Sequence, residues 1–196
     1  MKKKLTARQN EIADIALRLI AEGGMENFTI KNLAAQLGVT EPALYRHFRG
    51  KSYITKAMIS RFDTSVPVSE EISGFGAVAA FAKARFGLVA ANPPLARVMF
   101  AEEMFMGDPE FSKLMMSMMH RHKASIENAF AFAQNSGEIR ADIPLDMLFR
   151  LVFGPVRLLI KQWGMSGGAF DLAAKGDELI ETLRSVLKAE RRGKKK

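Results

Sequence analysis

The stretch TIKNLAAQLGVTEPALYRHFRGK, residues 29–51, decides the fold of this chain. Its first half carries apolar residues at helical spacing, including Leu33 and Leu37, and predicts a helix with one buried face. Gly38 follows the last of them, where a glycine most easily makes the left-handed turn that ends a helix. Thr40 then provides an N-cap for a second helix. This pattern is typical of a helix-turn-helix.

The second of these helices has a polar outer surface. Pro42 lies in its first turn, where the amide that proline lacks would have no partner anyway. Leu44 and Phe48, four residues apart, point inward. The residues left on the outside are Glu41, Pro42, Ala43, Tyr45, Arg46 and His47. Since cations follow directly at Arg49 and Lys51, we predict that this surface binds double-stranded DNA.

The charge of the chain is concentrated at its two ends. Residues 1–56 hold ten Lys or Arg and five acidic residues, a net charge of +5, whereas residues 57–187 hold thirteen and fifteen, a net charge of −2. Residues 188–196 hold six and one, again +5. A local basic patch favours phosphate binding because counterions are released. For the terminal lysines the alternative is a solvated end without a partner.

Composition and motifs argue against several other classes of protein. The 196 residues contain no cysteine, which excludes disulfides, thiolate zinc sites and cysteine nucleophiles. His120 and His122 are two residues apart and diverge on a helix, so we expect no metal site. There is no P-loop, Gly-x-Ser-x-Gly or His-Glu-x-x-His motif, and the adjacent Glu102 and Glu103 point roughly 100° apart on a helix. We therefore expect neither an enzyme nor a bound cofactor.

The chain also lacks the usual signs of export or membrane insertion. The N-terminal lysines precede a polar segment and not an apolar run, so the sequence predicts no secretory signal. No uncharged apolar stretch approaches the roughly 18 residues that a membrane span requires. We expect a cytoplasmic protein that does not interact with a membrane.

The predicted fold class is all-α. A helix over 6–22, ended by Gly23 and Gly24, precedes the helix-turn-helix and supports it, which makes residues 1–50 a three-helix DNA-binding domain. Residues 51–196 are predicted to form a larger helical bundle for ligand binding and dimerisation. Turn signals divide this bundle into helices over about 51–65, 74–91, 94–106, 109–136, 144–163 and 170–192.

Over residues 8–56 the sequence resembles the TetR family of bacterial transcriptional regulators. The resemblance rests on AEGG at the end of the first helix, on LAAQLGVTEPALYRHF, and on the motif Leu-Tyr-x-His-Phe-x-x-Lys, which runs from Leu44 to Lys51. It implies a homodimer with one DNA-reading head per subunit and a ligand-responsive bundle. From two heads related by a two-fold axis we expect a palindromic operator, and from the apolar residues of the bundle a small apolar effector. The predicted function is that of a repressor released from DNA by this effector.

The resemblance also implies roles for individual residues. Tyr45, His47 and Lys51 match family residues that contact backbone phosphates, and Thr40 matches a cap that also touches phosphate. The residues nearest base edges would be Glu41, Pro42, Ala43 and Arg46; Thr29, at the start of the first motif helix, completes the predicted DNA-binding set. For Arg46, whose guanidinium can donate two bonds to guanine, a phosphate contact is the alternative.

The last two helices carry apolar stripes that predict the dimer interface. The stripe of 144–163 comprises Leu148, Val152, Val156, Leu159 and Trp163, and that of 170–192 comprises Leu172, Leu179, Ile180, Leu183, Val186 and Leu187. Paired in two subunits, they would form a four-helix bundle. The alternative is that both stripes face the core of the same subunit. Gly154 and Pro155 are expected to bend the first helix or to allow close approach.

A ligand site is predicted from methionines and phenylalanines of the bundle. Methionine adapts to varied ligand shapes, although it also fills ordinary cores. The candidate lining residues are Met99, Phe100, Met104, Met115, Met119, Phe130 and Phe149. The alternative function is a DNA-binding structural or recruitment protein of the same fold without a small-molecule effector. A cavity in the bundle would favour the effector, and a filled bundle with a large exposed apolar patch would favour recruitment.

Overall fold

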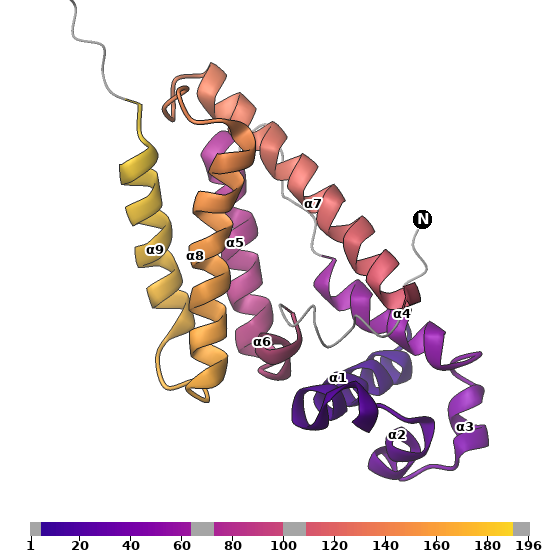
Figure 1. Ribbon diagram of the computed structural model, residues 1–196. Coiled ribbons are helices and arrows are strands. Elements are labelled where there is room, and N and C mark those ends of the chain that lie inside the picture. Colours follow the sequence, from indigo (N-terminus) through magenta and orange to yellow (C-terminus); the bar gives the residue numbers. More distant parts are fainter. Residues whose placement is uncertain (1–4, 64–72, 100–108, 190–196) are drawn as a thin grey trace, which may run out of the picture. The chain divides into compact units, whose positions relative to one another are not determined.

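The structure is a computed structural model that describes residues 5–63, 73–99 and 109–189 (Figure 1). Within these ranges the regular structure is helical, apart from one isolated bridge between Ile139 and Lys188, so the predicted all-α class is confirmed. The helices are α1 (Ala7–Asn27), α2 (Ile30–Leu37), α3 (Glu41–Tyr45), α4 (Lys51–Phe62), α5 (Gly74–Ala91), α6 (Pro94–Val98), α7 (Pro109–Asn135), α8 (Leu145–Met165) and α9 (Leu172–Leu187).

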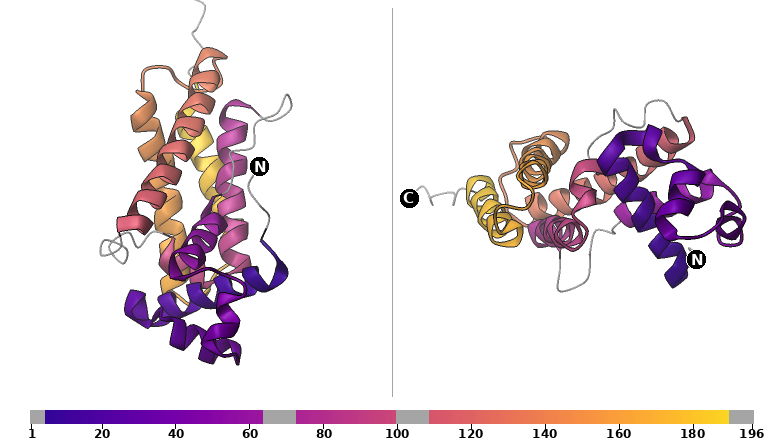
Figure 2. Two further views of the ribbon diagram at one scale, coloured as in Figure 1. Left: turned by 90° about the vertical axis from the view of Figure 1, so that its right-hand side faces the viewer. Right: turned by 90° about the horizontal axis from the view of Figure 1, so that it is seen from below.

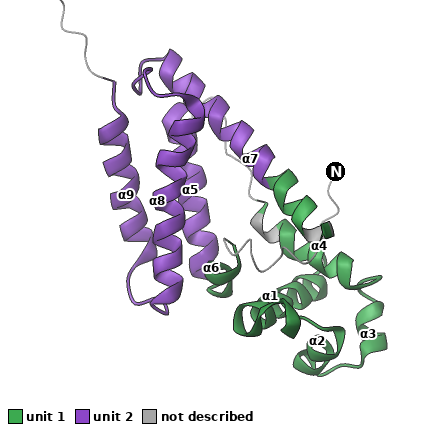
Figure 3. Ribbon diagram, in the orientation of Figure 1, with its two compact units in different colours: residues 1–63, 92–118 green, residues 64–91, 119–196 purple. Residues whose placement is uncertain are grey.

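The chain divides into two compact units (Figure 3). Unit 1 comprises residues 1–63 and 92–118, and unit 2 comprises residues 64–91 and 119–196. This division follows packing, and it groups α4 with unit 1 because α4 packs against α1. The predicted boundary between residues 50 and 51 separates a DNA-binding domain from a domain for ligand binding and dimerisation. It stays a prediction.

Unit 1 is organised around α1. A capping box starts this helix: the Thr6 hydroxyl accepts from the Gln9 amide at 3.2 Å, and the Gln9 side chain accepts from the Thr6 amide at 3.0 Å. The backbone leaves the helical conformation at Gly23 and Gly24, as the glycine pair predicts, and a last turn continues to Asn27. Gly24 has a φ of 72°, which glycine adopts without strain.

The short helix α6 packs against α1 within unit 1. The Asn92 side-chain amide donates to Asp14 Oδ1 at 3.3 Å, and Arg97 Nη1 donates to the Ala21 carbonyl at 3.5 Å. Leu95 is fully buried. The expected helix over 94–106 extends into residues that lie outside the described ranges, so only its first part is described. A segment from beyond the helix-turn-helix thus contacts the helix that supports it.

Unit 2 is built on α5, α8 and α9, which lie side by side (Figure 2). The helices α5 and α9 approach closely at Gly176, where a Cβ atom would overlap the ring of the buried Phe86. The helix α8 is continuous although it contains Pro155. Glycine at the crossing therefore determines how close the two neighbouring helices can pack.

By length and composition α5 is the one helix among the described residues that could cross a membrane, with a mean hydropathy of 1.3 over 18 residues. It carries Lys83 and Arg85 near its middle, and 56% of this window is buried inside the protein. Its packing against α8 and α9 is that of the core helix of a bundle.

The apolar stripe predicted on 144–163 lies mostly in the core of unit 2. Leu148 and Val152 are fully buried, and Val156 and Trp163 are nearly so. For these residues the expected contact with a second subunit is wrong, because they pack inside their own subunit. The stripe that is exposed on α8 comprises Met147, Leu151, Leu158 and Met165.

The stripe predicted on 170–192 is divided between core and surface. Leu172, Ile180 and Leu187 are buried, whereas Leu179 and Leu183 are half-buried. Val186 is 65% exposed. The described part of this helix therefore has a buried face and an adjoining apolar edge.

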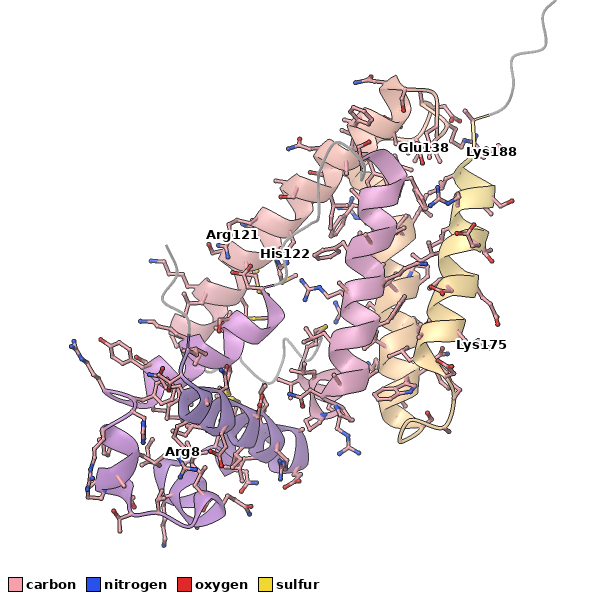
Figure 4. The ribbon with its side chains drawn as sticks, turned by 180° about the vertical axis from the view of Figure 1, so that it is seen from behind. Arg8, Arg121, His122, Glu138, Lys175 and Lys188 are labelled. Atoms are coloured by element: carbon pink, nitrogen blue, oxygen red, sulfur yellow. The ribbon has the colours of Figure 1, made fainter. Side chains whose placement is uncertain are left out.

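Glu138, in the turn after α7, connects three parts of unit 2. Its Oε2 accepts from the Phe75 amide at 3.0 Å in the first turn of α5, and its Oε1 lies 3.4 Å from Arg184 Nη1 of α9. The Arg184 guanidinium also lies 5.0 Å from the centre of the Phe75 ring. Figure 4 shows Glu138 near Lys188, at the end of α9, where the isolated bridge forms.

Replacing Glu138 by Ala is expected to lower the free energy of unfolding by about 1–3 kcal/mol, because the amide at the start of α5 loses its acceptor and Arg184 loses an anion. Urea denaturation of the purified protein measures this change. Glu178→Ala is the matched control, since Glu178 forms an exposed pair with Lys175 on α9, and exposed pairs contribute about 0–1 kcal/mol. Equal effects of the two substitutions would contradict the role of Glu138.

Candidate nucleic-acid interface

The two helices of the motif are joined by the predicted glycine turn. The Thr29 hydroxyl accepts from the Asn32 amide at 3.0 Å and so caps α2. At the other end Gly38 adopts a left-handed conformation with φ 65° and ψ 32°. The Val39 amide then donates to the Ala34 carbonyl at 3.0 Å, which satisfies a carbonyl of the last turn. These local features hold α3 against α2.

Thr40 occupies the N-cap position of α3 but does not cap it with its side chain. Its carbonyl accepts from the Ala43 amide at 3.0 Å and from the Leu44 amide at 3.3 Å, while its exposed hydroxyl makes no capping hydrogen bond. The expected side-chain cap is therefore wrong. The physical reason is that Pro42 has no amide hydrogen for the hydroxyl to accept, which leaves fewer donors in the first turn.

The inner and outer faces of α3 follow the predicted pattern. Leu44 is 2% exposed and Phe48 6%, so both anchor the helix in the core of unit 1. Of the residues expected outside, Ala43 is half-buried, and those that are exposed are Glu41, Pro42, Tyr45, Arg46 and His47. The regular helix ends at Tyr45, and the His47 and Phe48 amides both donate to the Leu44 carbonyl. A polar surface thus projects from an apolar support.

A contact from α1 fixes the end of this segment. Gln9 Nε2 donates to the His47 carbonyl at 2.9 Å, across 38 residues of sequence. Gln9 was not among the predicted site residues, and its part in the capping box gave no indication of this second contact. The bond positions the exposed cluster Tyr45, Arg46 and His47 relative to the supporting helix.

Lys51 is the first residue of α4 and is exposed. Its Nζ lies 4.8 Å from the centre of the buried Phe28 ring, a cation–π contact that restrains the side chain. A cation at a helix N-terminus opposes the helix dipole, whereas an anion there would be stabilised. The ammonium group and the positive end of the helix dipole therefore both attract an anion to this point.

Sequence reasoning missed a second exposed aromatic residue beside Lys51. Tyr53 lies in the first turn of α4 and is 46% exposed, and Lys56 Nζ lies 5.3 Å from the centre of its ring. The helical spacing of Ile54 and Met58, which are buried, could have identified Tyr53 as a residue of the outer face of α4. An exposed tyrosine next to two lysines is suited to contact phosphate.

The predicted ligand residues fall in both units. Met99 and Met115 are buried in unit 1, and Phe130 is buried in unit 2. Also in unit 2, Met119 is 40% exposed and Phe149 is half-buried. Phe100 and Met104 lie outside the described residues. The predicted cavity stays a prediction. Over the described ranges, no group of three metal-ligating side chains comes together.

Models of two protein families match this chain. The model described as "Bacterial regulatory proteins, tetR family" matches residues 12–58, which contain the helix-turn-helix. The model described as "YsiA-like protein, C-terminal region" matches residues 57–185. Together they extend from α1 to α9.

Individual proteins are similar over different lengths. The fatty acid metabolism regulator protein of Bacillus subtilis is 23% identical over 192 residues, which cover 93% of this chain and 97% of the relative. The nucleoid occlusion factor SlmA of Haemophilus ducreyi is 36% identical, but over 66 residues that cover 33% of each protein. The crystal structure of the transcriptional regulator FadR from Bacillus subtilis in complex with stearoyl-CoA has a TM-score of 0.72 at 22% identity, covering 92% of this chain and 98% of that one.

Proposed function

This chain belongs to the TetR family of bacterial transcriptional regulators, and from that premise we propose that it is a cytoplasmic, dimeric repressor that binds a palindromic operator and is released by a fatty-acyl effector. The observation that carries the proposal is the polar surface formed by α3 and the two residues after it. Its exposed residues are Glu41, Pro42, Tyr45, Arg46 and His47, and Leu44 and Phe48 hold it from behind. A helix supported in this way can enter a major groove while the surrounding helices contact the backbone.

The proposed DNA contacts divide into two groups. Tyr45, His47 and Lys51 contact backbone phosphates, with Thr29 and Thr40 as further polar groups at the starts of α2 and α3. The residues proposed to lie nearest base edges are Glu41, Pro42, Ala43 and Arg46. Phosphate contacts set the position of the helix, whereas contacts to base edges carry the sequence preference.

Replacing Arg46 by Ala is expected to change which operator bases contribute to the binding affinity. A guanidinium that donates two bonds to guanine discriminates against other bases by about 1–3 kcal/mol, and alanine cannot replace these bonds. Binding to a set of single-base operator variants measures the preference at each position. Uniform weakening on every duplex, with the preferences unchanged, would assign Arg46 to a phosphate instead.

Replacing Lys51 by Ala is expected to weaken binding equally on all sequences and to lower the salt slope by about one phosphate. The reason is that its ammonium group neutralises a backbone charge and reads no base. Titrations at several salt concentrations measure the slope. Lys175→Ala, an exposed lysine on α9 (Figure 4), is the control that should leave the slope unchanged. An unaltered slope in Lys51→Ala would contradict the phosphate contact.

The exposed stripe of α8 supports the proposed dimer. At 3.6 residues per turn, Met147, Leu151, Leu158 and Met165 lie within an arc of about 40° on the helix. Gly154 lies on the same face, and a Cβ atom there would meet no atom within 4 Å. On α9, Val186 is likewise an exposed apolar residue. A second copy that covers these residues would bury apolar side chains now in water and form a four-helix interface.

The proposed effector is a fatty-acyl compound. Support comes from the relative named as a regulator of fatty acid metabolism, which is similar over nearly all of both chains, and from the similar fold of FadR, which was crystallised with stearoyl-CoA. An effector that prefers one of two dimer states shifts the population toward it by its difference in affinity. The helix α6, which follows α5 in the sequence, contacts α1 through the bond between Asn92 and Asp14.

Selection of bound sequences from random duplexes tests the proposed function. We expect a palindromic consensus whose half-sites are about one helical turn, or a small multiple, apart. Adding oleoyl-CoA to the complex with this consensus should then release it. A consensus without two-fold symmetry would overturn the proposed dimer. If acyl compounds do not release the protein from the consensus duplex, the proposed effector is overturned.

A recruitment protein without an effector is the second candidate. It is favoured by the similarity to SlmA, a nucleoid occlusion factor, which covers 33% of each chain. The release experiment distinguishes the candidates, because a recruitment protein would stay on the consensus when an acyl compound is added.

A further inference from the structure

Gln9, in the first turn of α1, contacts two distant backbone groups with one side-chain amide. Its Oε1 accepts from the Thr6 amide at 3.0 Å, and its Nε2 donates to the His47 carbonyl at 2.9 Å. The backbone amide of Gln9 in turn donates to the Thr6 hydroxyl at 3.2 Å. One side chain therefore joins the start of α1 to the last residue of the polar surface formed by α3 and the two residues after it.

The two contacts together explain why this position holds a glutamine. Either glutamate or glutamine completes a capping box, because both have an oxygen that can accept from the N-cap amide. An ionised glutamate cannot donate a hydrogen bond, so its second oxygen would face the His47 carbonyl with no hydrogen between the two oxygens. The glutamine amide supplies both an acceptor for Thr6 and a donor for His47.

The bond from Gln9 connects a short segment to a helix that core packing holds in place. The helix α3 comprises five residues and ends at Tyr45, and helices of this length are not stable by themselves in water. On the other side of the bond, α1 is anchored by Ile12 and Ala16, both fully buried. Gln9 therefore restrains the position of His47 relative to the core of unit 1.

We propose that Gln9 is a positioning residue for the reading of DNA sequence: acting through the His47 carbonyl, it holds residues 45–47 in the arrangement that fits base edges. This inference rests on the proposed reading of DNA by the polar surface of α3 and the two residues after it. Without the bond, only a fraction of the protein has this arrangement, and the apparent affinity falls by that fraction.

The effect should fall on the sequence preference and not on DNA binding in general. Base edges are read through hydrogen bonds, whose strength depends steeply on geometry. Non-specific binding depends on the charge of the protein surface, and replacing Gln9 by another neutral residue leaves that charge unchanged. Loss of the bond to His47 is therefore expected to weaken the specific complex more than the non-specific one.

Two dissociation constants of the full chain test the inference: that for the selected palindrome and that for a duplex with the same base pairs in shuffled order. For Gln9→Met we expect the preference for the palindrome to fall roughly 5- to 100-fold. Loss of one ordinary hydrogen bond corresponds to roughly 2- to 10-fold, and a dimer binds with two reading heads.

Two further variants separate the bond to His47 from the capping box. Gln9→Glu keeps the oxygen that accepts from the Thr6 amide but loses the donor, so the preference should fall as in Gln9→Met. Its added negative charge weakens binding to both duplexes and cancels in their ratio. Thr6→Ala removes the hydroxyl half of the capping box and leaves both side-chain bonds of Gln9 in place. It should lower the midpoint of thermal unfolding and leave the preference unchanged.

The outcomes distinguish this inference from the proposed function. Equal weakening of both duplexes in Gln9→Met would overturn the inference while the proposed function stands. So would a preference that falls as much in Thr6→Ala as in Gln9→Met, because the effect would then come from the start of α1 and not from the bond to His47. Thermal unfolding checks that each variant is folded. If the wild type binds both duplexes equally, the inference and the proposed function are both overturned.

Discussion

Replacing Leu158 by Glu is expected to convert the dimer into monomers and to weaken operator binding by about 100-fold or more. Leu158 is 55% exposed at the centre of the stripe that also contains Met147, Leu151 and Met165. In a two-fold interface the substitution places two carboxylates in the apolar contact, one from each subunit. Removing each carboxylate from water costs roughly several kcal/mol. A monomer then offers one reading head to a site built for two.

Sedimentation or light scattering measures the first effect, and titration of the operator measures the second. Phe132→Glu is the matched control, because Phe132 is also 55% exposed but lies on α7, outside the stripe. It should leave both mass and affinity unchanged. A Leu158→Glu protein that remains dimeric with full operator affinity would remove α8 from the interface.

Replacing Gly176 by Val is expected to lower the free energy of unfolding by about 3 kcal/mol. A Cβ atom at this position would lie 2.5 Å from Phe86 Cε2, and Phe86 is 2% exposed, so neither the ring nor the helix can move without disturbing the core. Overpacking of a filled core typically destabilises by about 1–3 kcal/mol, and a β-branched residue adds two further carbons at the contact. The effect is a large part of the roughly 5–15 kcal/mol that stabilise a domain.

Urea denaturation measures this change, and Gly87→Val provides the control. Gly87 also lies in α5, but a Cβ atom there meets nothing within 4 Å, so the same substitution should change stability by no more than about 0.5 kcal/mol. Combining Gly176→Val with Phe86→Leu should recover part of the lost free energy of unfolding, because leucine is smaller than phenylalanine and leaves space for the valine side chain. If the two valine variants are equally stable, the close approach of α5 and α9 is not as described.

The parts of the fold that sequence predicted are those determined locally. Gly38 takes the left-handed turn because few other residues can, and Leu44 and Phe48 face inward because they are four apart on a helix. The bounds of α5 at Gly74 and Ala91 coincide with the predicted 74–91, since turn residues lie beyond both ends. Each of these features depends on residues a few positions away.

The features that sequence could not assign depend on contacts between distant segments. On α8, Leu148 and Leu151 both repeat at helical spacing, and only the packing of α5 and α9 decides that the first is in the core and the second in water. Thr40 has the residue type of a side-chain cap, but Pro42 changes the donors available to it. Arg85 was visible as a cation in an apolar helix, whereas its contact with His122 spans 37 residues and required the fold.

The central claim is that the polar surface formed by α3 and the two residues after it, Arg46 and His47, reads the sequence of double-stranded DNA. The most direct test is the ratio of two dissociation constants, measured at the same salt concentration: that for the palindrome selected from random duplexes and that for a duplex with the same base pairs in shuffled order. The account predicts that the shuffled duplex binds at least about 1,000-fold more weakly, as is typical of specific binding. Equal affinity for both duplexes would contradict it.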